Sequence, residues 1–254
     1  MTNGGRAYFD HVAIAVERWS DGYPVFVTTL GGHWVRGGSV GEFAPAQIGF
    51  GGGVNVELLQ PGTVADGFVR RFLDKGGPGP HHLTFMVPRL SDFVTTTTRY
   101  GLPAIGAFLE VPERPEAFVH PKGSGFGTLL QAIQFSDLEP DPSPPLGFPE
   151  PRPQSHQLSW VAVRVSDLSR AADFLVEATD ASLISAETGA RSVLLEWENR
   201  RRLLLLDGSG GGTGVDHVAF HVQGAAPPSP LSVLAEAGDI GGVHAPGIKI
   251  IVCR

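Results

Sequence analysis

The sequence predicts an α+β fold of tandem βαβββ modules, and three observations carry this prediction. A strand-like phrase with a histidine or tryptophan near its start occurs four times, at residues 9–16, 79–87, 158–165 and 215–222. Such repetition indicates a duplicated structural unit. His11 and Glu57 are 46 positions apart, and His82 and Gln131 are 49 apart, so two modules carry polar residues at matching places.

Each module is expected to contain a strand, a helix and three further strands. Alternating apolar residues predict the strands, and glycine-rich turns separate them. In the first module the predicted strands are residues 9–16, 33–36, 46–50 and 54–59, with helices over 20–30 and 64–75. In the second module the predicted strands are residues 82–87, 104–110, 116–120 and 127–133, with a helix over 90–100.

The third observation is a segment, residues 137–155, that holds seven prolines. Proline at this density favours an extended spacer over a helix or a central strand. We therefore expect a domain of two modules at 7–136, a linker at 137–155 and a second domain of paired modules at 156–254.

The second domain is expected to be degenerate. Its predicted strands are residues 161–165, 192–198 and 202–207, with a helix over 168–178. Its last module is short, because 34 positions separate His217 from Ile251, so at least one strand is expected to be lost or abbreviated.

Charge and composition argue against several classes of protein. The formal net charge is −7, which disfavours binding to nucleic acid or to an anionic membrane surface, since both depend on basic residues. A single cysteine, Cys253, suits a reducing compartment. The first residues lack the apolar stretch of a signal peptide, and no run of about 18 apolar residues occurs. We expect a cytoplasmic protein with 42% hydrophobic residues and an ordinary core.

The polar residues at matching places predict a metal site. If two modules close their sheets around a common cup, then His11, Glu57, His82 and Gln131 converge. Two imidazoles, one carboxylate and one amide oxygen suit a borderline divalent ion such as Zn, Ni, Co, Mn or Fe. Each residue alone also has a structural interpretation, as a buried polar group that bonds to a neighbour. The four together favour the metal.

Four segments, residues 10–16, 56–61, 81–85 and 120–131, resemble the vicinal oxygen chelate superfamily, which includes glyoxalase I, methylmalonyl-CoA epimerase, extradiol dioxygenases and bleomycin-resistance proteins. The likeness is greatest to the epimerase and glyoxalase branch and covers roughly residues 7–135. The resemblance implies that the first and last strands of the paired modules supply the metal ligands. Those positions correspond to His11, Glu57, His82 and Gln131 here.

The resemblance also bears on proton transfer. The last ligand position usually holds glutamate, and in glyoxalase I that carboxylate can also move the proton. Gln131 can ligate through its oxygen but cannot act as a base, so the transfer would fall to Glu57 or to a group outside the ligand set. Glu42 lies roughly where the epimerase has a non-ligand glutamate, and its alternative interpretation is a solvated loop acid. His120 is expected to shape the His-Pro-Lys turn.

The second domain resembles the same fold without its site. Trp160 takes the place of His11, Ile251 lies near the place of Gln131, and His217 is retained. A lone histidine does not make a metal site, so this half is expected to be structural.

Three functions remain open from the sequence. The first is a metal-dependent lyase or isomerase that stabilises an enolate of a small carbonyl or thioester substrate. The second is a non-catalytic protein that binds or sequesters a small molecule. The third is an Fe(II) dioxygenase of the extradiol type, which two histidines and one carboxylate also fit. A small-molecule substrate is expected, and association into a homodimer through sheet edges is a further expectation.

Overall fold

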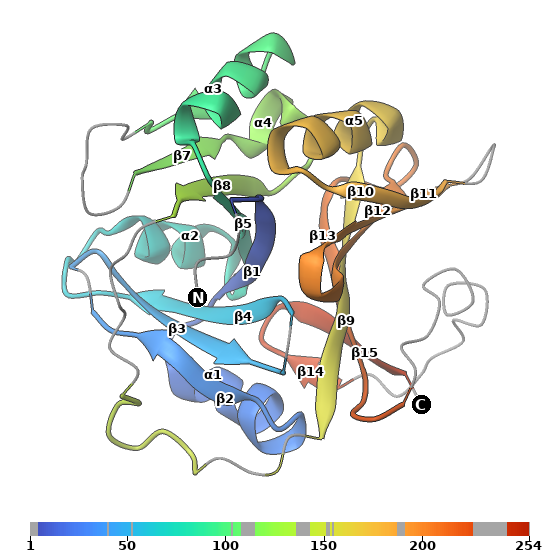
Figure 1. Cartoon of the computed structure of the whole chain (residues 1–254). Helices are drawn as coiled ribbons and strands as arrows, with labels where there is room; N and C mark the ends of the chain where they lie inside the picture. The colour runs from blue at the N-terminus through green and yellow to red at the C-terminus, as the bar shows by residue number, and fades with distance from the viewer. Residues whose placement is uncertain are drawn as a thin grey trace. The chain divides into compact units, whose positions relative to one another are not determined.

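The computed structural model describes residues 5–39, 41–51, 53–102, 104–107, 115–135, 143–150, 153, 155–186, 191–225 and 243–253 (Figure 1). The first module comprises β1 (Tyr8–Ala15), α1 (Trp19–Tyr23), the π-helix η1 (Pro24–Thr29), β2 (His33–Gly37), β3 (Phe43–Gly49) and β4 (Asn55–Pro61), and α2 (Phe68–Gly76) follows it. The second comprises β5 (Gly79–Val87), α3 (Leu90–Arg99), β6 (Ala104–Ile105), β7 (Glu116–Val119), α4 (Pro121–Ser124) and β8 (Leu129–Gln134).

The third module repeats this order, and three strands of the fourth are described. The third comprises β9 (His156–Val165), α5 (Leu168–Thr179), β10 (Ser182–Ala186), β11 (Ser192–Trp197), the 3₁₀-helix η2 (Glu198–Arg200) and β12 (Arg201–Asp207). In the fourth, β13 (Gly214–Val222), β14 (Val243–Ala245) and β15 (Ile248–Cys253) are described. The predicted α+β class with βαβββ modules is confirmed.

Several element ends differ from the prediction for local reasons. The helix expected over 20–30 is α1 followed by π-helical turns, with Leu30 N donating to Val25 O at 3.0 Å. Pro24 lies at the change of helix type and has no N–H for an α-helical bond. The strand expected over 104–110 begins as β6, and residues 108–110 lie outside the described part of the chain. β10 and the short α4 were not predicted.

The strands form two sheets. The first has eight strands in the order β2-β3-β4-β1-β5-β8-β7-β6, and the second has seven in the order β10-β11-β12-β9-β13-β15-β14. In every module the first strand pairs in parallel with the last one described: β1 with β4, β5 with β8, β9 with β12, and β13 with β15. Parallel pairing requires a crossover, which explains the helix after the first strand of the first three modules.

The parallel pairs of the first two modules share one register. Asn55 pairs with His11, so Glu57 lies two positions further along β4. Leu129 pairs with His82, so Gln131 again lies two positions further along β8. Residues i and i+2 of a strand share a face, so in each module the histidine and the later polar residue point to the same side of the sheet.

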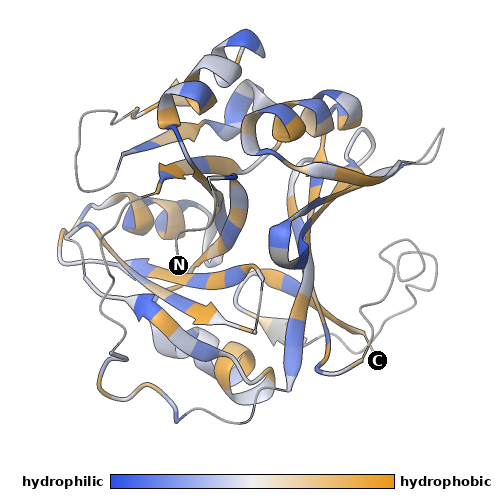
Figure 2. Cartoon of the chain, in the orientation of Figure 1, coloured by the Kyte–Doolittle hydropathy of each residue, from blue (hydrophilic) through white to orange (hydrophobic). Residues whose placement is uncertain are grey.

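Hydrophobic packing holds the first module around this face. Figure 2 shows hydrophobic and hydrophilic residues alternating along β4. Val56 and Leu58 are fully buried on one face of β4, and Glu57 and Leu59 lie on the other. Leu59 packs with Ala15 of β1 and with Val69 and Leu73 of α2. Helix α2 therefore packs on the same face of β4 that carries Glu57, two residues further along the strand.

The chain folds into two compact units. One contains Met1–Asp10, His82–Leu138 and Trp160–Asp216, and so combines the second and third modules. The other contains His11–His81, Glu139–Ser159 and His217–Arg254, and so combines the first and fourth.

Aromatic contacts hold each unit together. In the first unit the rings of Phe93 on α3 and Phe174 on α5 are 6.2 Å apart. In the second, Phe50 and Phe220 are 4.9 Å apart. Each unit thus joins modules from both sides of the proline-rich segment. The domain boundaries predicted at 137–155 stay a prediction. Among the described residues, no helix has the length and apolar character needed to cross a bilayer.

Candidate metal centre

His11 and Glu57 form a buried pair on adjacent strands. His11 Nε2 lies 3.4 Å from Glu57 Oε2, and the two side chains are 0% and 6% exposed. The register explains the meeting, since Glu57 stands opposite Ala13, whose small side chain leaves space beside the imidazole. Burying a carboxylate is costly unless partners compensate the charge. The sequence therefore places Glu57 here at a cost that its neighbours must offset.

Gln47 and Arg36 supply part of that compensation. Gln47 Nε2 donates to Glu57 Oε2 at 3.2 Å and lies 3.2 Å from His11 Nδ1. Arg36 Nε donates to Gln47 Oε1 at 2.9 Å. Gln47 stands opposite both Glu57 and Arg36 in the antiparallel ladders of β3. Neither residue was predicted; the signal in the sequence is a buried glutamine between Ala46 and Ile48, which parallels Glu57 between Val56 and Leu58.

His82 completes a group of three potential metal ligands. One ligand atom each of His11, Glu57 and His82 lies within 4.8 Å of the others, and all three residues are buried. Their strands, β4, β1 and β5, are successive neighbours in the eight-stranded sheet. Two imidazoles and one carboxylate at this spacing are a donor set for a borderline divalent ion. The residues present therefore fit the divalent metal that the sequence predicts.

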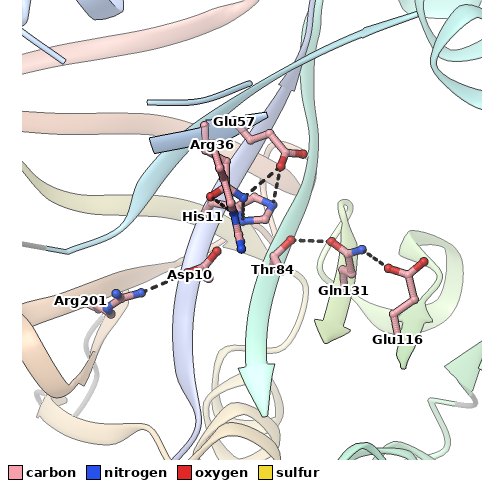
Figure 3. Close-up of polar contacts among 9 residues, drawn as sticks. Asp10, His11, Arg36, Glu57, Thr84, Glu116, Gln131 and Arg201 are labelled. Atoms are coloured by element: carbon pink, nitrogen blue, oxygen red, sulfur yellow. Dashed lines mark hydrogen bonds and ion pairs between the residues drawn. The ribbon is translucent and has the colours of Figure 1, made fainter. Parts of the chain in front are cut away.

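Gln131 makes two hydrogen bonds of its own (Figure 3). Its Oε1 accepts from Thr84 Oγ1 at 2.7 Å, and its Nε2 donates to Glu116 Oε2 at 2.7 Å. A carbonyl oxygen has a second lone pair, so ligation by Gln131 stays a prediction. Glu116 was not predicted as part of the site; its place on β7, two residues before the partner of Gln131, explains how its carboxylate arrives there.

Glu42 is exposed in the turn before β3, and its role as a base stays a prediction. Its backbone carbonyl accepts from Gly62 N at 3.0 Å. His120 shapes a turn, as expected: its Nδ1 accepts from Lys122 N at 3.0 Å.

His81 points elsewhere than its neighbour His82. Its ring lies 5.5 Å from the ring of Phe68 and 4.9 Å from that of Phe72, both on α2. Burial lowers the pKa of His81 to about 4. An imidazole that is neutral and packed between aromatic rings serves the hydrophobic core of this module.

The same register locates the corresponding positions of the later modules. Trp160 precedes Val161, which pairs with Leu203, so Leu204 takes the place of Glu57 in the third module. His217 pairs with Lys249, so Ile251 takes the place of Gln131 in the fourth, as predicted. The four equivalents are therefore Trp160, Leu204, His217 and Ile251, all of them buried. One imidazole with three apolar side chains offers a single ligand.

Comparison with known proteins agrees with this description. Residues 10–115 match the family model of the Glyoxalase/Bleomycin resistance protein/Dioxygenase superfamily. The predicted resemblance is confirmed over these residues. They include His11, Glu57 and His82 but end before Gln131. No curated protein sequence matches the chain.

Solved structures share the fold. A hypothetical protein from Staphylococcus aureus has a TM-score of 0.60 at 10% identity, covering 97% of this chain and 99% of its own. A mutant of 4-hydroxymandelate synthase from Streptomyces coelicolor has a TM-score of 0.57 at 16% identity, covering 86% and 71%. Methylmalonyl-CoA epimerase from Mycobacterium tuberculosis has a TM-score of 0.46 at 23% identity, covering 54% and 93%. The first two extend the likeness to both halves of the chain.

Proposed function

We propose that this superfamily protein is a metal-dependent lyase or isomerase that acts on a small carbonyl or thioester compound by moving a proton beside the carbonyl group. The observation that carries the proposal is the buried group of His11, Glu57 and His82, with donor atoms within 4.8 Å of one another. A bound divalent ion would act as a Lewis acid toward substrate oxygens and so acidify the adjacent C–H. The two imidazoles and Glu57 would hold it.

A carboxylate is assigned to the proton transfer, and two carboxylates make hydrogen bonds to residues of the site. Glu57 Oε2 is held by Gln47 Nε2 and faces His11, so it is committed to the ligand group. Glu116 lies beside Gln131 through the 2.7 Å bond between Glu116 Oε2 and Gln131 Nε2. A carboxylate can accept a proton, whereas the amide of Gln131 cannot. Glu116 therefore supplies a base next to the position where the superfamily usually has a glutamate.

A second candidate is an Fe(II) oxygenase. The donor group consists of two histidines and one carboxylate, which is the set that non-haem Fe(II) oxygenases use. The amide oxygen of Gln131 accepts from Thr84 Oγ1, which favours a three-residue ligand set. Oxygen consumption by the Fe(II)-loaded protein with candidate substrates separates this function from proton transfer, which consumes no oxygen.

The second sheet is proposed to be structural. The positions equivalent to the ligands hold Trp160, Leu204 and Ile251 beside the single His217. Apolar side chains there pack into the sheet and supply no donors. Loss of His217 is accordingly expected to leave the metal content unchanged.

The decisive experiment measures metal in His82→Ala by elemental analysis after loading with Zn²⁺ or Co²⁺ and desalting. His120→Ala is the matched control, since His120 is an exposed histidine that caps a turn. We expect one ion per chain in the control and loss of the ion in His82→Ala. Full retention of the metal in His82→Ala would refute the site.

The proton transfer is tested by exchange of the substrate C–H for deuterium in ²H₂O, which we expect to be abolished in Glu116→Gln. Metal binding without such exchange and without oxygen uptake would identify a binding protein.

A further inference from the structure

A series of hydrogen bonds connects Arg36 on β2 to His11 on β1 through Gln47. Arg36 Nε donates to Gln47 Oε1 at 2.9 Å. Gln47 Nε2 then lies 3.2 Å from both Glu57 Oε2 and His11 Nδ1. The four residues occupy four successive strands of the sheet, β2, β3, β4 and β1. The register of the ladders sets this order, because Arg36 and Glu57 both stand opposite Gln47.

The donor and acceptor roles in this series of hydrogen bonds follow from Arg36. A guanidinium has donors and no acceptor, so the atom of Gln47 that faces Arg36 must be the carbonyl oxygen. The NH₂ group of Gln47 must then face Glu57 and His11. An NH₂ group only donates, so His11 Nδ1 accepts. In a neutral imidazole the proton is consequently on Nε2, the atom that lies 3.4 Å from Glu57 Oε2.

This polarity opposes ligation by His11 Nε2. A ring nitrogen binds a metal through its lone pair, so Nε2 must lose its proton and Nδ1 must carry one. A protonated Nδ1 would face the NH₂ group of Gln47, donor against donor. Gln47 can resolve the conflict at His11 by turning its amide over, but its NH₂ group would then face the guanidinium of Arg36 and its carbonyl oxygen would face the carboxylate of Glu57. One unfavourable donor pair therefore remains as long as Arg36 keeps its place.

We propose that Arg36 and Gln47 are positioning residues that select the Nε2–H form of His11 and thereby weaken metal binding. The proposal rests on the proposed function, since it concerns the regulation of the same site. Any event that draws Arg36 away from Gln47 removes one of the two hydrogen bonds that fix the orientation of the amide, so the amide turns more readily and His11 then presents Nε2 beside Glu57. An anionic group of a substrate is the chemistry that a guanidinium binds, so such a group would tighten metal binding, and by linkage the metal would tighten binding of the anion.

The first test is direct and needs neither a metal nor a variant. Two-bond ¹H–¹⁵N correlation spectra of metal-free protein with ¹⁵N-labelled histidine report which ring nitrogen carries the proton. We expect His11 with an unprotonated Nδ1 and a protonated Nε2. A proton on Nδ1 would overturn the proposal. This result does not depend on whether the protein binds metal, so it distinguishes failure of the inference from failure of the proposed function.

The second test is a double-mutant cycle in Zn²⁺ affinity, measured by competition with a chromophoric chelator. Arg36→Met is expected to tighten binding roughly 10-fold or more, the equivalent of one hydrogen bond to a charged group. In a Gln47→Met background the same change is expected to alter affinity by less than about 2-fold, since the amide through which Arg36 acts is gone. An equal gain in both backgrounds would show that Arg36 acts by its charge alone, and would refute its role through Gln47.

Discussion

Replacing Arg201 by methionine is expected to destabilise the native state strongly, because one guanidinium stabilises three neighbours at the start of β1. Arg201 Nη1 donates to Phe9 O at 2.8 Å and lies 3.6 Å from Asp10 Oδ1. The guanidinium carbon also lies 4.2 Å from the ring centroid of Tyr8. The side chains of Arg201 and Asp10 are 14% and 8% exposed, so water screens this pair poorly.

The expected magnitude follows from that burial. Removing one partner of a buried ion pair costs about 3–5 kcal/mol, mainly because the other charge stays buried. The contact with the Tyr8 ring contributes roughly 0.5–2 kcal/mol of this loss. For a chain of this size, we expect the melting temperature to fall by about 10 °C. Methionine retains the apolar stem, so the loss reflects the charge and its hydrogen bond.

Urea unfolding followed by circular dichroism measures this effect. Arg191→Met is the matched control, since Arg191 is 84% exposed and lies 3.7 Å from Asp207 Oδ2; less than about 0.5 kcal/mol is expected there. Adding Asp10→Asn to Arg201→Met should recover part of the loss, because the buried charge is removed. A loss below about 1 kcal/mol in Arg201→Met, or no recovery in the double variant, would refute the reasoning.

Two further predictions concern single positions. Burial lowers the pKa of His81 to about 4 from its usual 6.5, so between these pH values the unfolded state binds more protons than the native state. The free energy of unfolding should therefore fall by up to about 3 kcal/mol as the pH drops from 6.5 to 4. Urea midpoints of His81→Gln should lose much of this pH dependence, and an unchanged pH profile in the variant would contradict the prediction. Gly247 has φ +66°, and a Cβ added there would lie 1.8 Å from Pro78 O, so Gly247→Ala should unfold at a clearly lower urea concentration than wild type. Gly210 has open space around it, so Gly210→Ala should match wild type. Equal urea midpoints for the two variants would contradict this prediction.

The buried polar residues in apolar strands explain why the candidate metal ligands could be predicted from the sequence. Glu57 between Val56 and Leu58 is too costly to bury without a role, and His11 and His82 recur at equivalent places. The duplication predicted that the histidine and the later polar residue share a face, and the register confirms it in both modules. These features depend on local pattern and on repetition, both of which are present in the chain before it folds.

The hydrogen-bond partners of these side chains could not be predicted from the sequence in the same way. The bonds of Gln131 to Thr84 and Glu116, and those of Gln47 to Arg36 and Glu57, join side chains on neighbouring strands. Which side chains meet depends on ladder register and bulges, and the shift between Trp34 and Arg36 on β2 is one such irregularity. A slip of one residue would turn each of these side chains to the other face.

The sequence by itself determined the repeated module, the α+β class and the two histidines and carboxylate of the candidate metal centre, because periodicity and the cost of burying charge are properties of the chain. The tertiary structure decided that the first module joins the fourth and the second joins the third in compact units. It also decided that Gln47 and Arg36 set the polarity around His11. Packing and hydrogen bonds between strands distant in sequence make those choices, and they exist after the sheets have formed.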